Sequence, residues 1–161
     1  PYQGSIHIPL LMARVPGIKP GSVSDRLTEL RDILPTLTEL AGVDTPEGVD
    51  GVSLLQDPDR EYLHGEHSGG DLGNHYIVTK TDKYCWFTQS GREQYFRLDK
   101  DPKELHDAIE EPDCQERIAH LRSLLIQELT GREEGYTDGL RLIPGRPEKC
   151  CLSFLPPRQQ S

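Results

Sequence analysis

Residues 75–98, HYIVTKTDKYCWFTQSGREQYFRL, carry the pattern that decides the fold. Three short runs rich in β-branched and aromatic residues, at 75–81, 83–89 and 93–98, are separated by polar turn residues. Such runs are typical of β-strands, and the short turns between them predict an antiparallel meander. Two sets of side chains alternate along the last run, so we expect a sheet with one face covered.

A helical pattern that follows the sheet predicts what covers it. One apolar stripe at helical spacing consists of Ile118, Leu121, Leu125 and Leu129. Asp113 and Glu116 have the spacing of a capping box, so we expect the helix to begin at Asp113 and to end before Gly131. The predicted fold class is therefore α+β: a small antiparallel sheet packed by one long helix.

The beginning of the chain is organised differently. An apolar run within residues 5–17 ends at a Pro-Gly pair, and we expect it to form a buried strand. Residues 33–41 have helical spacing, with Asp32 as the N-cap and Gly42 as the C′ residue. The sequence therefore predicts one strand and one helix before the meander.

These patterns divide the chain into three segments. Turn-forming residues over 44–60 link two structural units, so we expect residues 1–57 to form one unit and residues 58–132 the other. Residues 133–161 are rich in Gly and Pro and have no periodic pattern. We expect this last segment to be an irregular tail that lies over the second unit.

Composition limits the classes of partner. The net charge is −9, from 27 acidic and 18 basic residues, which gives little electrostatic support for nucleic-acid binding. The sequence contains no apolar run long enough for a transmembrane helix. The four cysteines lack C-x-x-C spacing, so we expect reduced thiols and no zinc site built from them, while disulfides stay open.

Four stretches of the sequence form an ordered set: residues 1–25, 30–43, 49–55 and 82–110. They contain Pro-Thr-Leu at 35–37, Val-Asp-Gly-Val-Ser-Leu at 49–54 and Leu-Asp-Lys-Asp-Pro-Lys-Glu at 98–104. Taken in order, these stretches resemble the C-terminal portion of type I sulfatases, the arylsulfatase branch of the alkaline phosphatase superfamily. The resemblance extends over about residues 1 to 132.

The resemblance implies that residues 1–57 supply the last strand and helix of the large α/β sulfatase domain, before the small domain. It implies that the full-length protein hydrolyses sulfate esters, on a sulfated carbohydrate or an aryl sulfate. It also implies a formylglycine nucleophile and Ca²⁺ or another divalent cation. The compartment stays open between the bacterial cytoplasm and periplasm.

The chain itself lacks the family's nucleophile motif, Cys/Ser-x-Pro-x-Arg, at every Cys and Ser. In the family, the calcium ligands and a sulfate-holding Lys precede the equivalent of Tyr2. We therefore assign no catalytic residue, no metal ligand and no cofactor to this segment. We expect it to be inactive alone, and to need the N-terminal sulfatase region as its partner.

The run EYLHGEHSGG, residues 61–70, raises a separate question. It is not the H-E-x-x-H pattern of zinc proteases, because Glu66 lies between the two histidines. On an extended chain His64 and Glu66 point one way and His67 the other, which argues against three metal ligands converging within this run. The resemblance places the run near the mouth of the active-site pocket. His64 and His67 are therefore candidate substrate-binding residues, and strand-edge or interdomain hydrogen bonding is the alternative.

Two rival functions remain on the sequence alone. A phosphodiesterase or phosphonate hydrolase of the same superfamily shares this fold. A non-catalytic interaction module is the rival from another class, and it predicts a stable monomer without an exposed apolar face. The sulfatase interpretation predicts exposed apolar segments, which would favour association.

Overall fold

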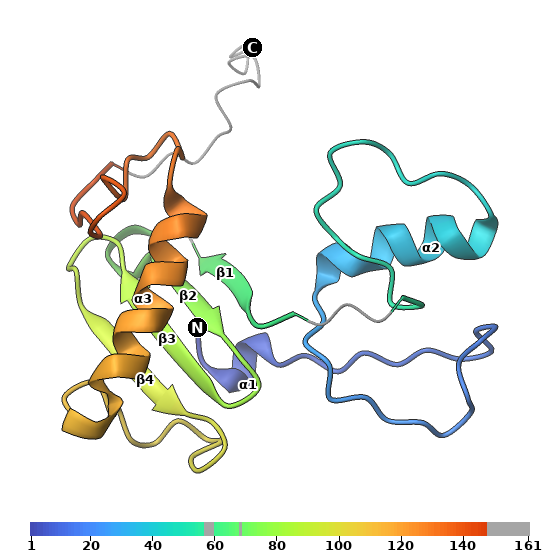
Figure 1. The fold of residues 1–161 in the computed structure, drawn as a ribbon, viewed down its shortest axis with the longest axis horizontal. Coiled ribbons are helices and arrows are strands. Elements are labelled where there is room, and N and C mark those ends of the chain that lie inside the picture. The colour runs from blue at the N-terminus through green and yellow to red at the C-terminus, as the bar shows by residue number, and fades with distance from the viewer. Residues whose placement is uncertain (57–59, 68, 148–161) are drawn as a thin grey trace, which may run out of the picture.

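A computed structural model describes residues 1–56, 60–67 and 69–147, and it has two parts (Figure 1). The N-terminal part, residues 1–56, contains α1 (Gln3–Ile6), a 3-10 turn (Leu30–Asp32) and α2 (Ile33–Ala41). The sheet part, residues 60–147, contains the β-sheet and α3 (Gln115–Leu129). The expected boundary at residue 57 and the tail residues 148–161, with Cys150 and Cys151, lie outside the described residues.

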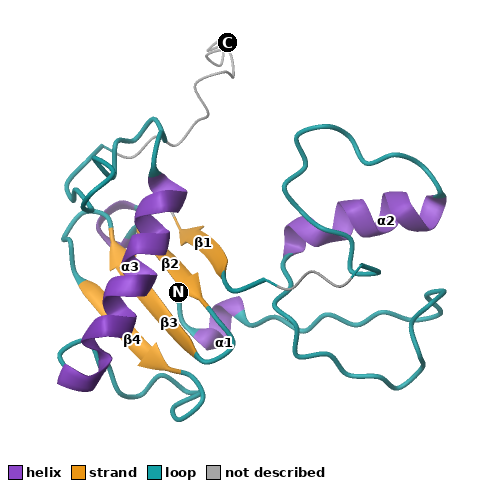
Figure 2. Cartoon of the chain, viewed as in Figure 1, coloured by secondary structure: helices purple, strands orange, loops and turns teal. Residues whose placement is uncertain are grey.

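The sheet part is an antiparallel meander in the order β1-β2-β3-β4. Its strands are β1 (Leu63–His67), β2 (Asn74–Val78), β3 (Asp82–Phe87) and β4 (Glu93–Arg97). The three predicted strands are confirmed, and β1 adds a fourth at the edge, within the HGEH run. Helix α3 lies across one face of the sheet (Figure 2), as the α+β prediction requires.

The core lies between this face and α3. Tyr84 and Trp86 of β3 are fully buried against the helix. The four predicted stripe residues of α3 are all buried as well, which confirms the helical pattern. The predicted capping box is wrong: a 3-10 turn (Pro112–Cys114) comes first, α3 begins at Gln115, and Asp113 pairs with Arg97 instead. Pro112 at the start of that turn favours the tighter entry.

The opposite face of the sheet is covered by the beginning of the chain. Tyr2 packs edge-on against Phe96 at a centroid distance of 6.0 Å. Lys83 Nζ donates to the Pro1 carbonyl at 2.6 Å and forms an ion pair with the buried Glu104. All six residues of β3 are consequently buried, so the expectation of one covered face is wrong at the centre of the sheet.

The described tail folds back onto the sheet part. Tyr136 is buried against Trp86, and the backbone N–H of Gly145 donates to the Thr88 carbonyl at 2.9 Å. One isolated bridge joins Thr137 and Leu142. Residues 133–147 thus contact the sheet part and contain no helix or strand apart from this bridge.

The N-terminal part has far less internal structure. The buried strand predicted within residues 5–17 is wrong: this segment has no strand, and Leu11 is 93% exposed. A strand needs neighbours for its backbone groups, and the described residues provide none there. Helix α2 is confirmed with Gly42 left-handed at its end, but Asp32 does not cap it through its side chain. That carboxylate accepts instead from the backbone N–H groups of Glu29 and Val52.

Candidate functional site

The HGEH run is strand β1, which pairs with β2 along its whole length. Glu66 lies opposite His75, and the neighbouring positions alternate between the two faces. Gly65 leaves room for the Tyr76 ring, because a Cβ there would lie 2.1 Å from that ring. The polar run therefore forms a strand, with its one small residue where the neighbouring side chain crosses.

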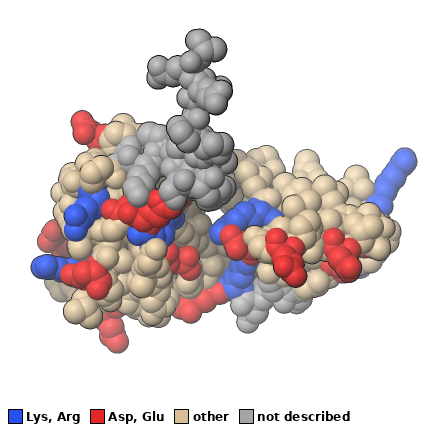
Figure 3. Space-filling model, turned by 90° about the horizontal axis from the view of Figure 1, so that it is seen from above, with Lys and Arg blue, Asp and Glu red and all other residues tan. Residues whose placement is uncertain are grey.

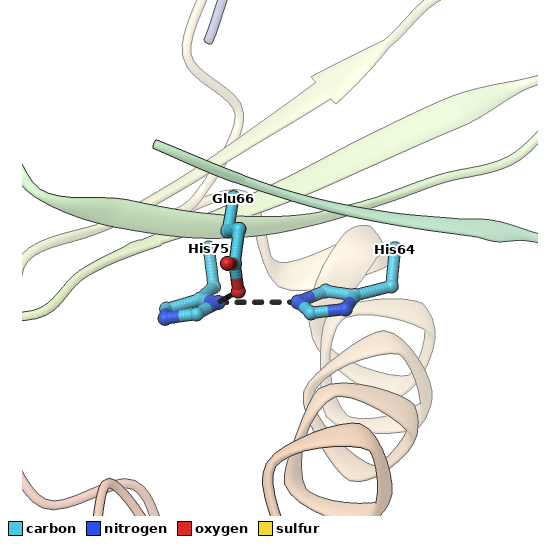
Figure 4. A group of neighbouring side chains, drawn as sticks. All are labelled: His64, Glu66 and His75. Atoms are coloured by element: carbon cyan, nitrogen blue, oxygen red, sulfur yellow. Dashed lines mark hydrogen bonds and ion pairs between the residues drawn. The ribbon is translucent and has the colours of Figure 1, made fainter. Parts of the chain in front are cut away.

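Three side chains converge on the α3 side of β1 and β2: His64, Glu66 and His75 (Figure 4). The Nε2 atom of His64 lies 3.1 Å from Nδ1 of His75, and the two rings are nearly parallel. The Glu66 Oε2 atom lies 3.6 Å from the same Nδ1 atom. Two imidazole nitrogens and a carboxylate oxygen thus share one small volume.

Charged side chains surround this cluster. Arg132 donates to Glu66 Oε2 at 2.6 Å and to Glu134 Oε1 at 3.0 Å. The Glu128 Oε2 atom lies 3.8 Å from Nδ1 of His64. The ring nitrogen of His64 that faces away from His75 is therefore next to a carboxylate, which favours a proton on that nitrogen.

Burial sets the electrostatics of the two histidines. Desolvation, followed by the neighbouring His64 ring, lowers the pKa of His75 to about 4. Desolvation also lowers the pKa of His64, although Glu128 and Glu66 act in the opposite direction. Burial alone would raise the pKa of Glu66, but the hydrogen bond from Arg132, together with the charges of Arg132 and the two histidines, lowers it. At neutral pH both imidazoles are uncharged and the carboxylate is ionised.

The structure places the two candidate substrate-binding histidines on opposite faces of the sheet. His64 belongs to the α3 side, whereas His67 lies opposite Asn74 on the other side and is exposed. No pattern in the sequence assigns a role to His75, although it is the direct neighbour of His64. The register between the two strands brings them together, and no spacing within one run carries that information.

A cleft of about 470 Å³ separates the N-terminal part from the sheet part, and His64 lies at its wall. Both parts contribute charged groups to it. Its lining residues are Glu29, Arg31, Asp50, Val52, Arg60, Tyr62, Leu63, His64 and Glu128. The walls therefore carry both cationic and anionic groups, which suits a polar ligand.

One buried ion pair connects the two parts beside this cleft. Arg60 donates to both carboxylate oxygens of Asp32, each at 2.6 Å, and Asp32 is fully buried. Burial alone would raise the pKa of Asp32, but the hydrogen bonds from Arg60 and Val52 bring it below its usual range. The bidentate geometry fixes the direction in which the chain enters β1.

The family described as N-sulphoglucosamine sulphohydrolase, C-terminal, matches residues 1–131. The chain belongs to this C-terminal family of the sulfatases. An arylsulfatase of Clostridium perfringens is 49% identical over 156 residues, which is 91% of this chain and 32% of that protein. The segment thus spans about a third of the length of this relative. The predicted resemblance to the C-terminal portion of the sulfatases is confirmed.

Solved structures share the fold of this sulfatase segment. A 2-O GAG sulfatase is 26% identical, with a TM-score of 0.58 over 70% of this chain and 27% of that one. A phosphonate monoester hydrolase from Silicibacter pomeroyi is 21% identical, with a TM-score of 0.61 over 72% of this chain and 28% of that one. The second likeness concerns the fold alone.

The described residues do not supply the calcium site that the family implies. They contain two groups of metal-ligand side chains: His64, Glu66 and His75, and a second made of Glu111, Asp113 and Cys114. Calcium prefers six or more oxygen ligands, and neither group is an all-oxygen set. We therefore derive no step of catalysis through Ca²⁺ or formylglycine in this segment.

No described helix is long and apolar enough to cross a membrane.

Proposed function

We propose that this chain is the C-terminal segment of a sulfatase that hydrolyses sulfate esters, on a sulfated carbohydrate or an aryl sulfate. The family match over residues 1–131, together with the arylsulfatase relative, carries the proposal. The segment lacks the Cys/Ser-x-Pro-x-Arg motif and is inactive alone. The nucleophile and the metal ligands lie in the N-terminal sulfatase region that the family requires.

The apolar surface of the N-terminal part supports docking against that region. Helix α2 exposes leucines along its length, including Leu37 at 57% and Leu34 at 47%. A helix with an unburied apolar side is stabilised by packing on another element. Figure 3 shows a broad area without charged side chains over this part, beside a row of Lys, Arg, Asp and Glu. We propose that residues 1–57 complete the large sulfatase domain there.

We propose substrate contacts for His64 and His67. His64 lines the cleft between the two parts, next to cationic groups from Arg31 and Arg60, which suit a sulfated ligand. An uncharged His64 imidazole can hydrogen-bond a sugar hydroxyl or an aryl leaving group. His67 is exposed on the other face of the edge strand, so a contact with substrate requires the N-terminal region to bring the pocket to that face.

Two alternatives compete with this proposal. The phosphonate monoester hydrolase has the same fold, so phosphonate or phosphodiester hydrolysis is the second candidate. A non-catalytic interaction module is the third. The exposed leucines of α2 count against a module that is stable as a monomer.

An assay of the full-length protein tests the proposal. We expect sulfate release from 4-nitrophenyl sulfate or from sulfated disaccharides, and little turnover of phosphonate monoesters or phosphodiesters. The isolated segment should release no sulfate. The variants His64→Gln and His67→Gln should raise KM more than they lower kcat, whereas His106→Gln, on an exposed loop, should change neither. Preferred turnover of phosphonates would instead support the second candidate.

A further inference from the structure

The cluster on the α3 side of β1 and β2 has the donor set of a transition-metal site. We propose that His64 Nε2, His75 Nδ1 and a carboxylate oxygen of Glu66 together bind one divalent metal ion of the zinc class. Two imidazoles and one carboxylate suit Zn²⁺, Co²⁺ or Fe²⁺, and they are a poor set for Ca²⁺. His64 is shared with the proposed substrate contacts, but the metal proposal is tested by metal binding alone, because all three ligands lie within the sheet part.

The distances fit one shared ion. Zinc binds imidazole nitrogen at about 2.0–2.1 Å, so two nitrogens 3.1 Å apart subtend about 100° at one ion. An oxygen 3.6 Å from the second nitrogen subtends about 120°. The first angle is slightly smaller than the tetrahedral angle, and the second is slightly larger. All three donor atoms lie within 4.8 Å of one another, and the half-exposed Glu66 side chain has room for the remaining movement.

The sheet holds these ligands in place. His64 and Glu66 are two residues apart on β1 and share a face, and His75 lies opposite Glu66 on β2. His75 is further fixed by Trp86 and Tyr136, whose ring centroids lie 6.4 Å and 5.3 Å from its own. The convergence that is awkward within HGEH alone is thus achieved by a third ligand from the neighbouring strand.

The groups around the cluster match those that accompany bound metals. A ligating histidine usually has a carboxylate near its other ring nitrogen, and Glu128 has this place beside Nδ1 of His64. Arg132 now holds Glu66, and when Glu66 turns toward an ion, Arg132 keeps its second carboxylate partner, Glu134. A bound cation therefore leaves no buried charge unpaired.

The second group of metal-ligand side chains, Glu111, Asp113 and Cys114, is a weaker candidate. Arg97 forms ion pairs with both of its carboxylates, so a metal ion would have to displace this one guanidinium from both ligands. His106, which also contacts Glu111, is exposed. Among the described residues, the histidine cluster is thus the better site for a metal ion.

A titration of the full chain with Co²⁺ at neutral pH tests the proposal. A tetrahedral site with two His and one Glu gives intense visible absorption bands, and Zn²⁺ should abolish them by displacing Co²⁺. We expect His64→Gln and His75→Gln each to weaken Co²⁺ binding by more than about 100-fold, and Glu66→Gln to weaken it by about 10-fold. Zn²⁺ should also raise the Tm of the wild type, raise that of Glu66→Gln less, and leave those of His64→Gln and His75→Gln unchanged.

Matched controls separate this site from surface binding. His67→Gln lies on the same strand but on the other face, and His120→Gln removes an exposed histidine that contacts Glu61. Both variants should keep the Co²⁺ spectrum. Because His75 is buried, circular dichroism should first confirm that His75→Gln is folded, and the more accessible His64→Gln decides if it is not. A weak octahedral spectrum, or one that His64→Gln leaves unchanged, would overturn the proposal.

Discussion

The two parts of the molecule each contain a helix with an apolar stripe, but one stripe is buried and the other is exposed. The stripe of α3 is buried against a four-stranded sheet, with Leu125 fully inaccessible. The leucines of α2 have the same kind of spacing, yet Leu34 and Leu37 are largely exposed. An amphipathic pattern therefore shows that a helix has a face to bury. It does not show whether the surface that covers this face belongs to the same segment.

The largest expected contrast comes from the same substitution in both helices. Leu125→Ala should lower the free energy of unfolding of the sheet part by about 2–5 kcal/mol, because it leaves a cavity in a closed core. Leu37→Ala should change it by less than about 0.5 kcal/mol, since that side chain is exposed. Urea unfolding followed by Trp86 fluorescence measures both. Equal losses would show that the two helices share one core.

A glycine in the N-terminal part gives the next contrast. A Cβ on Gly51 would lie 1.9 Å from the carbonyl oxygen of Arg31, and backbone cannot rotate away. Gly51→Ala should therefore destabilise the packing of the 3-10 turn and α2 by about 1–3 kcal/mol. Hydrogen exchange should increase in α2 and stay unchanged in α3.

In the sheet part, the matched substitution is Gly65→Ala, for which the three atoms nearest the new Cβ all belong to the Tyr76 side chain. A side chain can move aside, so this variant should lose less stability than Gly51→Ala. Faster exchange in α3 after Gly51→Ala would show that the loss of packing around α2 also destabilises the sheet part.

A smaller effect concerns pH. Burial alone would raise the pKa of Asp82, but hydrogen bonds from Arg117 and Thr79 bring it below 3.8. The unfolded chain then takes up this proton first as the pH falls, so the stabilisation is complete above about pH 3.8 and is lost below it. Asp82→Asn should cost about 1 kcal/mol near neutral pH, because Arg117 is partly exposed.

Denaturant unfolding at neutral pH and near pH 3 measures this difference, which should shrink in acid. Asp71→Asn, on the exposed turn before β2, is the control and should leave the free energy of unfolding unchanged at both pH values. A difference for Asp82→Asn that stays constant with pH would show that the carboxylate is not held in its ionised form.

The smallest change is in association and leaves the fold intact. Exposed leucines on α2 should cause the isolated chain to self-associate with rising concentration. The double variant Leu34→Gln/Leu37→Gln should reduce this, and size-exclusion chromatography with light scattering follows it. A wild-type chain that stays monomeric at high concentration would favour the interaction module over the sulfatase segment.

The sheet part could be predicted from the sequence because its contacts are local. Strands β2 to β4 follow one another through short turns, and the stripe of α3 comes next in the chain. Strand β1 was missed as a strand because His64, Gly65 and Glu66 lack β-branched or aromatic character. Its pairing with β2 stabilises it despite this composition.

The rest of the site depends on contacts between residues far apart in the chain, which local sequence patterns do not predict. The role of His75 beside His64 follows from strand register, and the Asp32–Arg60 pair joins residues 28 positions apart. The strand expected within residues 5–17 does not form. The apolar run is present, but no described strand lies beside it. A local apolar pattern does not make a strand unless a neighbouring strand pairs with it.

The first three residues have a topological consequence for the whole chain. Pro1 accepts from Lys83, and the Gln3 N–H donates to Glu104 at 2.5 Å, so the backbone contacts the sheet part at residues 1–3, leaves it, and returns at Arg60. The intervening residues are thus a loop anchored at both ends on one body. A single proteolytic nick near the exposed Leu11 would cut this loop, but the backbone on each side of the cut would keep its own anchor on the sheet part.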